Sequence, residues 1–135
     1  MIVVDTNLIA SLFLPTEATA MAERVLKQDS QWAAPCFWRS EFRNVLATGM
    51  RTGRFDFSFA VEAMQAAEEL VAGNEYSLPN LPILRLARES GCSAYDCEFV
   101  ALAEELGIHL VTFDKQVLKA FPERALAPSA YLSAT

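Results

Sequence analysis

The sequence predicts an α/β domain whose short parallel sheet is covered by helices on both faces. Short apolar segments that favour strands alternate along the chain with longer segments whose apolar residues recur at helical spacing. The chain has 135 residues, 53% of them hydrophobic and 21% charged, which is enough to bury one core. The sequence holds no internal repeat or linker, so we expect residues 1–135 to form a single domain.

The first half of the chain is predicted to alternate strands and helices. Residues 2–4 are apolar and β-branched and precede a polar cluster, which indicates a short buried strand. Pro35 stops a second strand, and Gly73 stops the last helix of this half. The predicted strands are 2–4 and 32–34, and the predicted helices are 17–28, 38–50 and 58–72.

The second half continues the alternation. Gly91 and Gly107 each follow a helical segment, a position that glycine commonly takes at the end of a helix. In open parallel sheets, ligands bind beyond the carboxyl ends of the strands, which directs attention to Asp5 and Asp114. The predicted strands are 76–78, 108–112 and 125–127, and the predicted helices are 83–90, 94–106 and 115–121.

The composition excludes several classes of protein. No apolar run reaches the roughly 20 residues that cross a bilayer, and the first residues lack the basic start of a secretory signal. We therefore expect a cytoplasmic protein with no membrane partner. The three cysteines form no CxxC pair, which argues against disulfides and structural zinc and favours reduced packing residues.

The charge balance bears on nucleic-acid binding. The net charge is −6 and the pI is near 4.7, whereas nucleic-acid-binding proteins usually present a basic face. Net charge describes an average field, however, and part of the excess could be carboxylates gathered at a metal ion. Local basic residues are Arg39, Arg43, Arg51 and Arg54 around one helix, and Lys115 and Lys119 after Asp114.

Asp5 and Asp114 each stand where a predicted strand passes into a helix. Aspartate is a preferred N-cap residue, so either side chain could simply cap a helix. If the two strands are adjacent, however, the carboxylates face each other, and like charges that close raise a pKa unless a cation neutralises them. Asn7 shares a face with Asp5 if the extended run continues that far, and otherwise it is a polar residue at the start of a helix.

Asp96 follows Ser93 at the spacing of a capping box, which is the alternative to a functional role. At about 100° per residue, Asp96 lies at the edge of an apolar stripe, where a carboxylate needs a partner to offset its desolvation. We therefore favour a functional Asp96. The stripe comprises Tyr95, Phe99, Leu102, Ala103 and Leu106, while Glu98 and Glu105 are expected to point to solvent.

Glu41 borders the apolar face of its predicted helix, with a surface glutamate beside an arginine as the alternative. The only histidine, His109, begins the fourth predicted strand and is not placed to act as a general base. Carboxylate oxygens are hard ligands that suit Mg²⁺ or Mn²⁺ better than zinc. The candidate ligands are Asp5, Glu41, Asp96 and Asp114.

Four motifs occur in the order seen in PIN-domain ribonucleases: VVDTN, SEFRNVL, SAYDCEFVALAEELG and LVTFDKQVLKAF. Over nearly the whole chain they resemble especially the VapC-type toxins of toxin–antitoxin pairs. The resemblance implies a PIN-like three-layer sandwich with sheet order 3-2-1-4-5, which places the first and fourth strands side by side. Cys97 departs from the small residue common at its position, and NEYSLPNLP is less β-like than the third strand of the family.

The resemblance also implies a function. Asp5, Glu41, Asp96 and Asp114 match the acidic quartet that is catalytic and binds metal in the family, and Asn7 and Thr112 match polar positions that arrange the site. The implied chemistry is Mg²⁺- or Mn²⁺-dependent endonucleolytic hydrolysis of RNA phosphodiesters. The implied partners are an RNA substrate, a cognate antitoxin that blocks the active site, and a second copy of the chain in a homodimer.

Two other functions are weighed against this one. A phosphatase of the haloacid-dehalogenase kind also begins with a strand, an aspartate and a polar residue, and Asp5 would then form an aspartyl phosphate. Such a phosphatase needs a late pair of aspartates, which the sequence lacks. The other alternative is a PIN-like module that has lost catalysis and only binds protein, against which the intact quartet argues.

Overall fold

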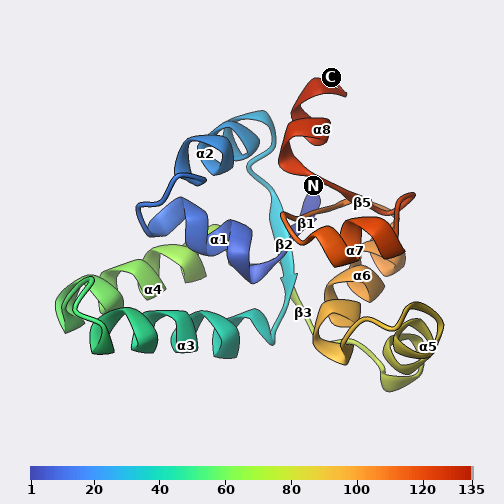
Figure 1. The fold of residues 1–135 in the computed structure, drawn as a ribbon, viewed down its shortest axis with the longest axis horizontal. Helices are drawn as coiled ribbons and strands as arrows, with labels where there is room; N and C mark the ends of the chain where they lie inside the picture. Colours follow the sequence, from blue (N-terminus) through green and yellow to red (C-terminus); the bar gives the residue numbers. More distant parts are fainter. Residues whose placement is uncertain (135) are drawn as a thin grey trace.

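A five-stranded parallel sheet forms the middle layer of the computed structural model, which describes residues 1–134 (Figure 1). Residue 135, the last of the predicted domain 1–135, lies outside the described part. The strand order is β3-β2-β1-β4-β5 and every pairing is parallel, which confirms the order implied by the family resemblance. The strands are β1 (Ile2–Val4), β2 (Trp32–Pro35), β3 (Glu75–Tyr76), β4 (Leu110–Val111) and β5 (Ala125–Leu126).

Helices cover both faces of the sheet. Figure 1 shows α1 to α4 on one side of the strands and α5, α6 and α7 on the other. This arrangement confirms the predicted α/β class. The helices are α1 (Thr6–Phe13), α2 (Thr19–Gln28), α3 (Trp38–Arg51), α4 (Phe57–Val71), α5 (Asn80–Ser90), α6 (Ala94–Leu106), α7 (Lys115–Ala120) and α8 (Pro128–Ser133).

The central strands are buried on both faces, as parallel strands between two helical layers must be. Every residue of β1 and β2 is buried, and α6 packs against both strands with six buried side chains. The largest fully buried side chains include Trp32, Trp38 and Phe42, which lie in one continuous hydrophobic core. This core fixes the strand ends and the adjacent helix turns that carry the candidate site.

Helix α1 confirms the interpretation of Asp5 as a helix cap, although its bounds were not predicted, and helix α8 was not expected from the sequence. Helix α1 begins directly after β1, with Asp5 as its N-cap, so the extended run does not continue to Asn7. Its bounds were not predicted because the segment is short and mainly apolar and buries Leu8 and Ile9, and periodicity alone does not separate such a segment from a strand. Helix α8 starts with Pro128 at its first turn and likewise has no long periodic pattern.

Several predicted boundaries were also wrong. Helix α5 starts at Asn80 instead of residue 83, and α2 starts at Thr19 instead of residue 17. Strand β4 pairs only over Leu110–Val111, so His109 precedes the strand instead of beginning it. Strand β3 covers Glu75–Tyr76 instead of 76–78, because the edge strand gives way to an extended segment before Pro79.

Two expectations about packing need correction. Cys92 and Cys97 are free and buried, as predicted, but Cys36 is exposed and is not a packing residue. Tyr95 is 61% exposed, although the helical wheel placed it on the apolar stripe. None of the helices in residues 1–134 is both long enough and apolar enough to cross a membrane.

Candidate active site

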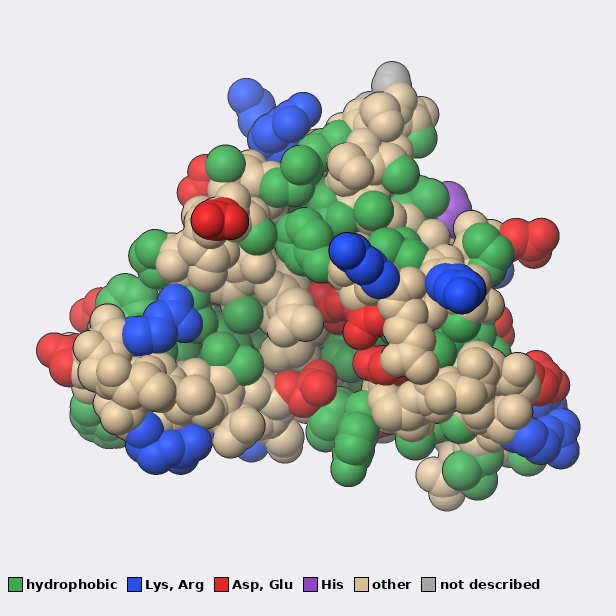
Figure 2. All heavy atoms as spheres, in the orientation of Figure 1, with side chains coloured by type: hydrophobic (Ala, Val, Ile, Leu, Met, Phe, Trp, Pro, Cys, Tyr) green, Lys and Arg blue, Asp and Glu red, His purple; other side chains and the backbone are tan. Residues whose placement is uncertain are grey.

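The predicted carboxylates converge on one cleft at the carboxyl ends of β1 and β4. Figure 2 shows acidic side chains gathered in a hollow near the middle of one face of the molecule. The cleft has a volume of about 60 Å³, and all four of its carboxylates are half-buried. They come from the end of β1, from α3, from α6 and from the end of β4. The lining residues are Asp5, Thr6, Asn7, Glu41, Asp96, Phe99 and Asp114.

Asp5 both caps a helix and lines the cleft, so the two interpretations of this residue are compatible. Its Oδ1 accepts a hydrogen bond of 2.9 Å from the backbone N–H of Leu8, and its Oδ2 accepts one from the hydroxyl of Thr112. Burial raises the pKa of Asp5 to about 6, the two hydrogen bonds lower it, and the charges of Asp114 and Glu41 raise it. In the metal-free protein at neutral pH, Asp5 is therefore ionised, and its ionisation lowers the stability of the fold.

Asp114 has the same two roles at the neighbouring strand. Its Oδ1 accepts a hydrogen bond of 3.0 Å from the backbone N–H of Val117 and so caps α7. The buried hydroxyl of Thr112 donates to Asp5 and accepts a 3.0 Å hydrogen bond from the backbone N–H of Asp114. Thr112, predicted as a site-arranging residue, therefore connects the two strand-end aspartates.

Glu41 lies in the first turn of α3 and is held by a residue that the sequence analysis did not single out. The hydroxyl of Thr6 donates a 2.7 Å hydrogen bond to Oε1 of Glu41, and Thr6 is buried. Burial and the charge of Asp96 raise the pKa of Glu41, while the bond from Thr6 lowers it. The signal for Thr6 was its place between Asp5 and Asn7, at the end of a buried strand.

Asp96 fulfils only half of the capping-box pattern. Ser93 caps α6 by accepting a 3.1 Å hydrogen bond from the backbone N–H of Asp96. No backbone N–H in residues 1–134 donates to the Asp96 carboxylate, so the reciprocal bond of the box is not formed. Burial, followed by the charge of Asp114, raises the pKa of Asp96, while a hydrogen bond with the Ser93 side chain lowers it. Asp96 therefore contacts the cap residue Ser93 and also lines the cleft.

The positions of Asn7 and Glu98 differ from those expected from the sequence. Asn7 lines the cleft, but it does so from the first turn of α1 and not from an extended strand. Glu98 was expected to point to solvent, whereas it is half-buried, and burial and the charge of Glu41 raise its pKa. The burial of Glu98 was not predicted because a helical wheel describes α6 alone, whereas Glu98 is also close to Glu41 on α3.

No cation of the described chain neutralises the cleft. The ion pairs found in residues 1–134 connect the N-terminus with Asp29, Arg39 with Glu68 and Glu75, and Arg88 with Glu89. Half-buried carboxylates without a cationic partner are costly, and their raised pKa values express that cost. The cleft therefore has the electrostatics of a site for an added cation.

The donor set fits Mg²⁺ or Mn²⁺. All four carboxylates are hard oxygen donors, and no histidine or cysteine lines the cleft in the described structure. No group of three or more His, Cys, Asp or Glu side chains in residues 1–134 is arranged to enclose an ion directly. Mg²⁺ usually keeps several water ligands and takes one or two protein carboxylates, so this arrangement agrees with the chemistry of that ion.

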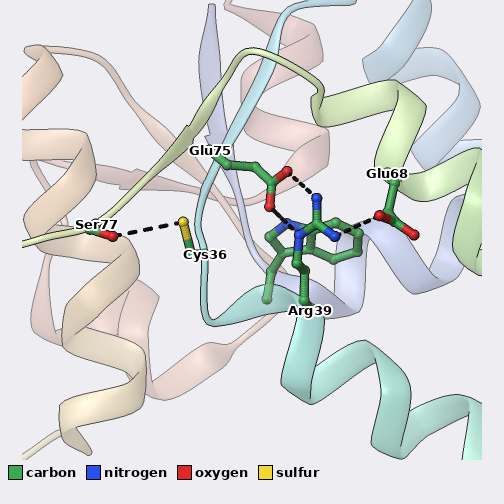
Figure 3. Close-up of polar contacts among 6 residues, drawn as sticks. Cys36, Arg39, Glu68, Glu75 and Ser77 are labelled. Carbon is green, nitrogen blue, oxygen red and sulfur yellow. Dashed lines mark hydrogen bonds and ion pairs between the residues drawn. The ribbon is translucent and has the colours of Figure 1, made fainter.

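Arg39 is one of the basic residues near the predicted site, but its guanidinium is already bound to two glutamates outside the cleft (Figure 3). Its Nε and Nη2 each donate a 2.7 Å hydrogen bond to Glu75, and its Nη1 donates one of 2.5 Å to Glu68. The indole N–H of Trp38 donates a 2.9 Å bond to the same Glu75. These four side chains, here called the arginine network, join α3 to α4 and β3, so Arg39 is not a free RNA contact.

The strand order and the carboxylate-lined cleft at the strand ends define a PIN-like α/β fold. The model of the family described as PIN domain matches residues 2–123, and the chain belongs to this family.

A related sequence and two solved structures agree with this assignment. Ribonuclease VapC3 of Pyrobaculum aerophilum is 30% identical over 134 residues, covering 90% of this chain and 95% of that protein. The crystal structure of PAE2754 from the same organism matches with a TM-score of 0.76 and 25% identity, covering 98% of this chain and 86% of the other. A toxin–antitoxin complex from Klebsiella pneumoniae matches in fold, with a TM-score of 0.67, 16% identity, and coverage of 95% and 98%.

Proposed function

We propose that this protein is a Mg²⁺- or Mn²⁺-dependent endoribonuclease that hydrolyses RNA phosphodiesters as the toxin of a type II toxin–antitoxin pair. The observation that carries the proposal is the cleft in which Asp5, Glu41, Asp96 and Asp114 meet without a cation. The ribonuclease named among its relatives supports the reaction, and the toxin–antitoxin complex with the same fold supports the biological setting.

The residues divide between holding the ion and handling the water. Asp5, Asp96 and Asp114 would hold a divalent ion, directly or through water, and Glu41 would orient the attacking water or complete a second ion site. The ion, when bound, polarises the phosphate and offsets the negative charge that develops on it. Thr6 fixes the direction of the Glu41 carboxylate, and Thr112 fixes Asp5 relative to Asp114. The raised pKa of Glu41 makes it a better proton acceptor than an ordinary glutamate.

Basic side chains near the cleft would bind the RNA phosphates. Arg39 is excluded from that role, which leaves Arg43, Arg51 and Arg54 and the two lysines of α7. Figure 2 shows basic side chains over α7, beside the acidic hollow. Phosphate contacts of this kind give affinity that falls steeply with salt concentration.

Two protein partners belong to the proposal. The VapC-type resemblance supports a homodimer and a small antitoxin that blocks the acidic cleft. Light scattering of the purified chain measures the first, and inhibition of cleavage by the candidate antitoxin measures the second. A monomeric chain with full activity would remove the dimer from the proposal and leave the nuclease.

The decisive experiment compares Asp96→Asn with a matched carboxylate on the same helix. We expect RNA cleavage by the wild type only with Mg²⁺ or Mn²⁺, and a loss of about 10²- to 10⁴-fold in Asp96→Asn. Glu105→Gln, an exposed site on α6, should cleave at the wild-type rate. Equal cleavage by all three proteins would refute the site. No cleavage by any of them would favour the protein-binding module, and a trapped phosphoenzyme would favour the phosphatase.

A further inference from the structure

Two aromatic rings form a stacked pair beside the acidic cleft. The rings of Phe37 and Tyr95 lie nearly parallel, with centroids 5.0 Å apart and an angle of 11° between their planes. Phe37 covers one face of Tyr95, and Tyr95 is nevertheless 61% exposed, so its other face is open to solvent. An open aromatic face on a side chain that is already held by stacking is a preformed platform for a further flat ring.

The platform is continuous with the candidate active site through both of its helices. Tyr95 is the neighbour of Asp96 on α6, and Phe37 is the N-cap residue of α3, four positions before Glu41. Glu98, one turn after Tyr95, lies close enough to Glu41 for their charges to act on each other. A nucleotide attached to a phosphate in the acidic cleft would therefore have its base next to this platform.

Tyr95 also lines a cavity of about 350 Å³ that shares no lining residue with the acidic cleft. That volume lies at the lower end of the range for small-molecule sites. Its apolar walls are suited to the faces of a base, while the amide of Asn80 and the carboxylate of Glu98 can meet polar edges. The lining residues are Leu78, Asn80, Ile83, Leu84, Tyr95 and Glu98, together with Ala94.

We propose that this cavity, with Tyr95 as its stacking platform, binds an unstacked nucleobase of single-stranded RNA next to the scissile phosphate. The proposal rests on the nuclease function proposed above and adds a substrate site to it. Sequence-selective RNA recognition commonly uses bases that are splayed out onto aromatic side chains. The carboxylate of Glu98 accepts hydrogen bonds, and a base with an exocyclic amino group offers it two N–H donors on one nitrogen, whereas uracil offers only its single ring N3–H, so the site favours amino-bearing bases.

The test measures steady-state cleavage of short single-stranded RNAs by the full chain. Loss of a base–aromatic stack should raise the KM of Tyr95→Ala about 5- to 150-fold, with kcat within about 3-fold of wild type. Tyr95→Phe keeps the ring and should restore the KM. Phe57→Ala, which removes a ring that is 73% exposed in α4, is the matched control and should behave as wild type.

A fluorescent 2-aminopurine base placed along the RNA locates the site, because its emission should be quenched at one position in wild type and not in Tyr95→Ala. Glu98→Gln should weaken the preference for amino-bearing bases over uracil at that same position.

Three outcomes would overturn the inference, and they are distinguishable from one another. If the wild type cleaves RNA and Tyr95→Ala has the same KM, the base site is absent while the nuclease stands. If Tyr95→Ala also turns a dimer into a monomer in light scattering, the platform is an interface between copies of the chain. If the wild type cleaves no RNA at all, the proposed function fails and this site fails with it.

Discussion

The acidic cleft and the arginine network both contain carboxylates, but their surroundings shift the carboxylate pKa values in opposite directions. In the network, Arg39 donates two hydrogen bonds to Glu75 and one to Glu68 (Figure 3). These bonds hold the pKa of Glu75 below its usual value. In the cleft, Asp5 has no cationic partner in the described chain, and burial raises its pKa to about 6.

The contrast separates carboxylates that stabilise the fold from carboxylates that are retained at a cost. The network joins three elements by charge-assisted bonds, so its ionised form favours the folded state. The cleft gathers like charges in a half-buried place, so its ionised form opposes the folded state until a cation arrives. The two regions should therefore respond in opposite directions to substitution, to pH and to metal.

The largest expected effect is on the rate of RNA cleavage. It tests whether the cleft serves catalysis while the arginine network serves only stability. Asp5→Asn should lower the rate of RNA cleavage about 10²- to 10⁴-fold, because it removes a charge proposed to hold the ion. Glu75→Gln should leave the rate within about 3-fold, because the network lies outside the cleft. Initial rates at saturating Mn²⁺ measure both. A loss in Glu75→Gln equal to that in Asp5→Asn, with the fold intact, would show that the division is wrong.

The next effect is on the stability of the metal-free protein, where Asp5→Asn should be more stable than wild type at pH 7.5. A folded pKa of about 6 against an ordinary value of 3.8 corresponds to about 1–3 kcal/mol of destabilisation by the ionised group. The folded state binds the Asp5 proton more tightly, so stability falls as pH rises from about 4 to about 6. The gain in Asp5→Asn should therefore be present at pH 7.5 and vanish near pH 4, as measured by urea unfolding in EDTA.

A matched variant and a metal addition check this prediction. Asp56 caps α4 through a 2.9 Å bond from the N–H of Phe59, as Asp5 caps α1, but it is exposed. Asp56→Asn should therefore bring no comparable gain. Mg²⁺ should stabilise the wild type by mass action and Asp5→Asn much less. Equal stabilisation of both by Mg²⁺ would place the ion elsewhere.

Much of the fold followed from local patterns. The strands at 2–4 and 32–34 were evident because buried parallel strands are short continuous apolar runs, and both α5 and α6 end at glycines with positive φ. The strand order came from the family resemblance and not from periodicity. A helix after Asp5 was expected, but the bounds of α1 were not, since its sequence is short and mainly apolar.

The candidate site was predictable only where a residue shows its role locally. Asp5 and Asp114 follow strands, and Asp96 and Glu41 border apolar helix faces, so their positions were visible in the sequence. The bond from Thr6 to Glu41 spans 35 residues, and the bonds from Arg39 to Glu75 span 36, so no pattern within one element could indicate them. Contacts of that kind arise only when the sheet order brings distant segments together.

Removal of the network cation should have a moderate effect of opposite sign to Asp5→Asn. Arg39→Ala leaves Glu75 with only the Trp38 bond and Glu68 without its partner, and should lower the unfolding free energy by about 1–2 kcal/mol at pH 7.5. The figure is modest because Arg39 and Glu68 are each about one-third exposed. Because the pKa of Glu75 is lowered, this contribution should be present above about pH 4.5 and be lost in more acidic solution.

The effects of the two regions on stability should change with pH in opposite directions, so one experiment can compare them. Urea unfolding of wild type, Asp5→Asn and Arg39→Ala between pH 4 and 7.5 should show the two variants separating from wild type in opposite directions as pH rises. Arg39→Lys keeps the charge but cannot form the paired bonds to Glu75, and should fall between wild type and Arg39→Ala. Parallel curves for all three proteins would contradict the assignment of both regions.

The smallest effect concerns the link between the cleft and the fold at Thr112. Thr112→Val keeps the shape of this buried side chain but removes the hydroxyl that donates to Asp5 and accepts from the N–H of Asp114. Because the hydroxyl bond lowers the pKa of Asp5, its loss should raise that pKa above about 6 and destabilise the metal-free protein by about 1 kcal/mol at pH 7.5. Carboxyl NMR titration of Asp5 measures the shift directly. Thr112→Ser retains the hydroxyl and should titrate like wild type, so an equal shift in both variants would mean that packing, and not this hydrogen bond, sets the charge of the cleft.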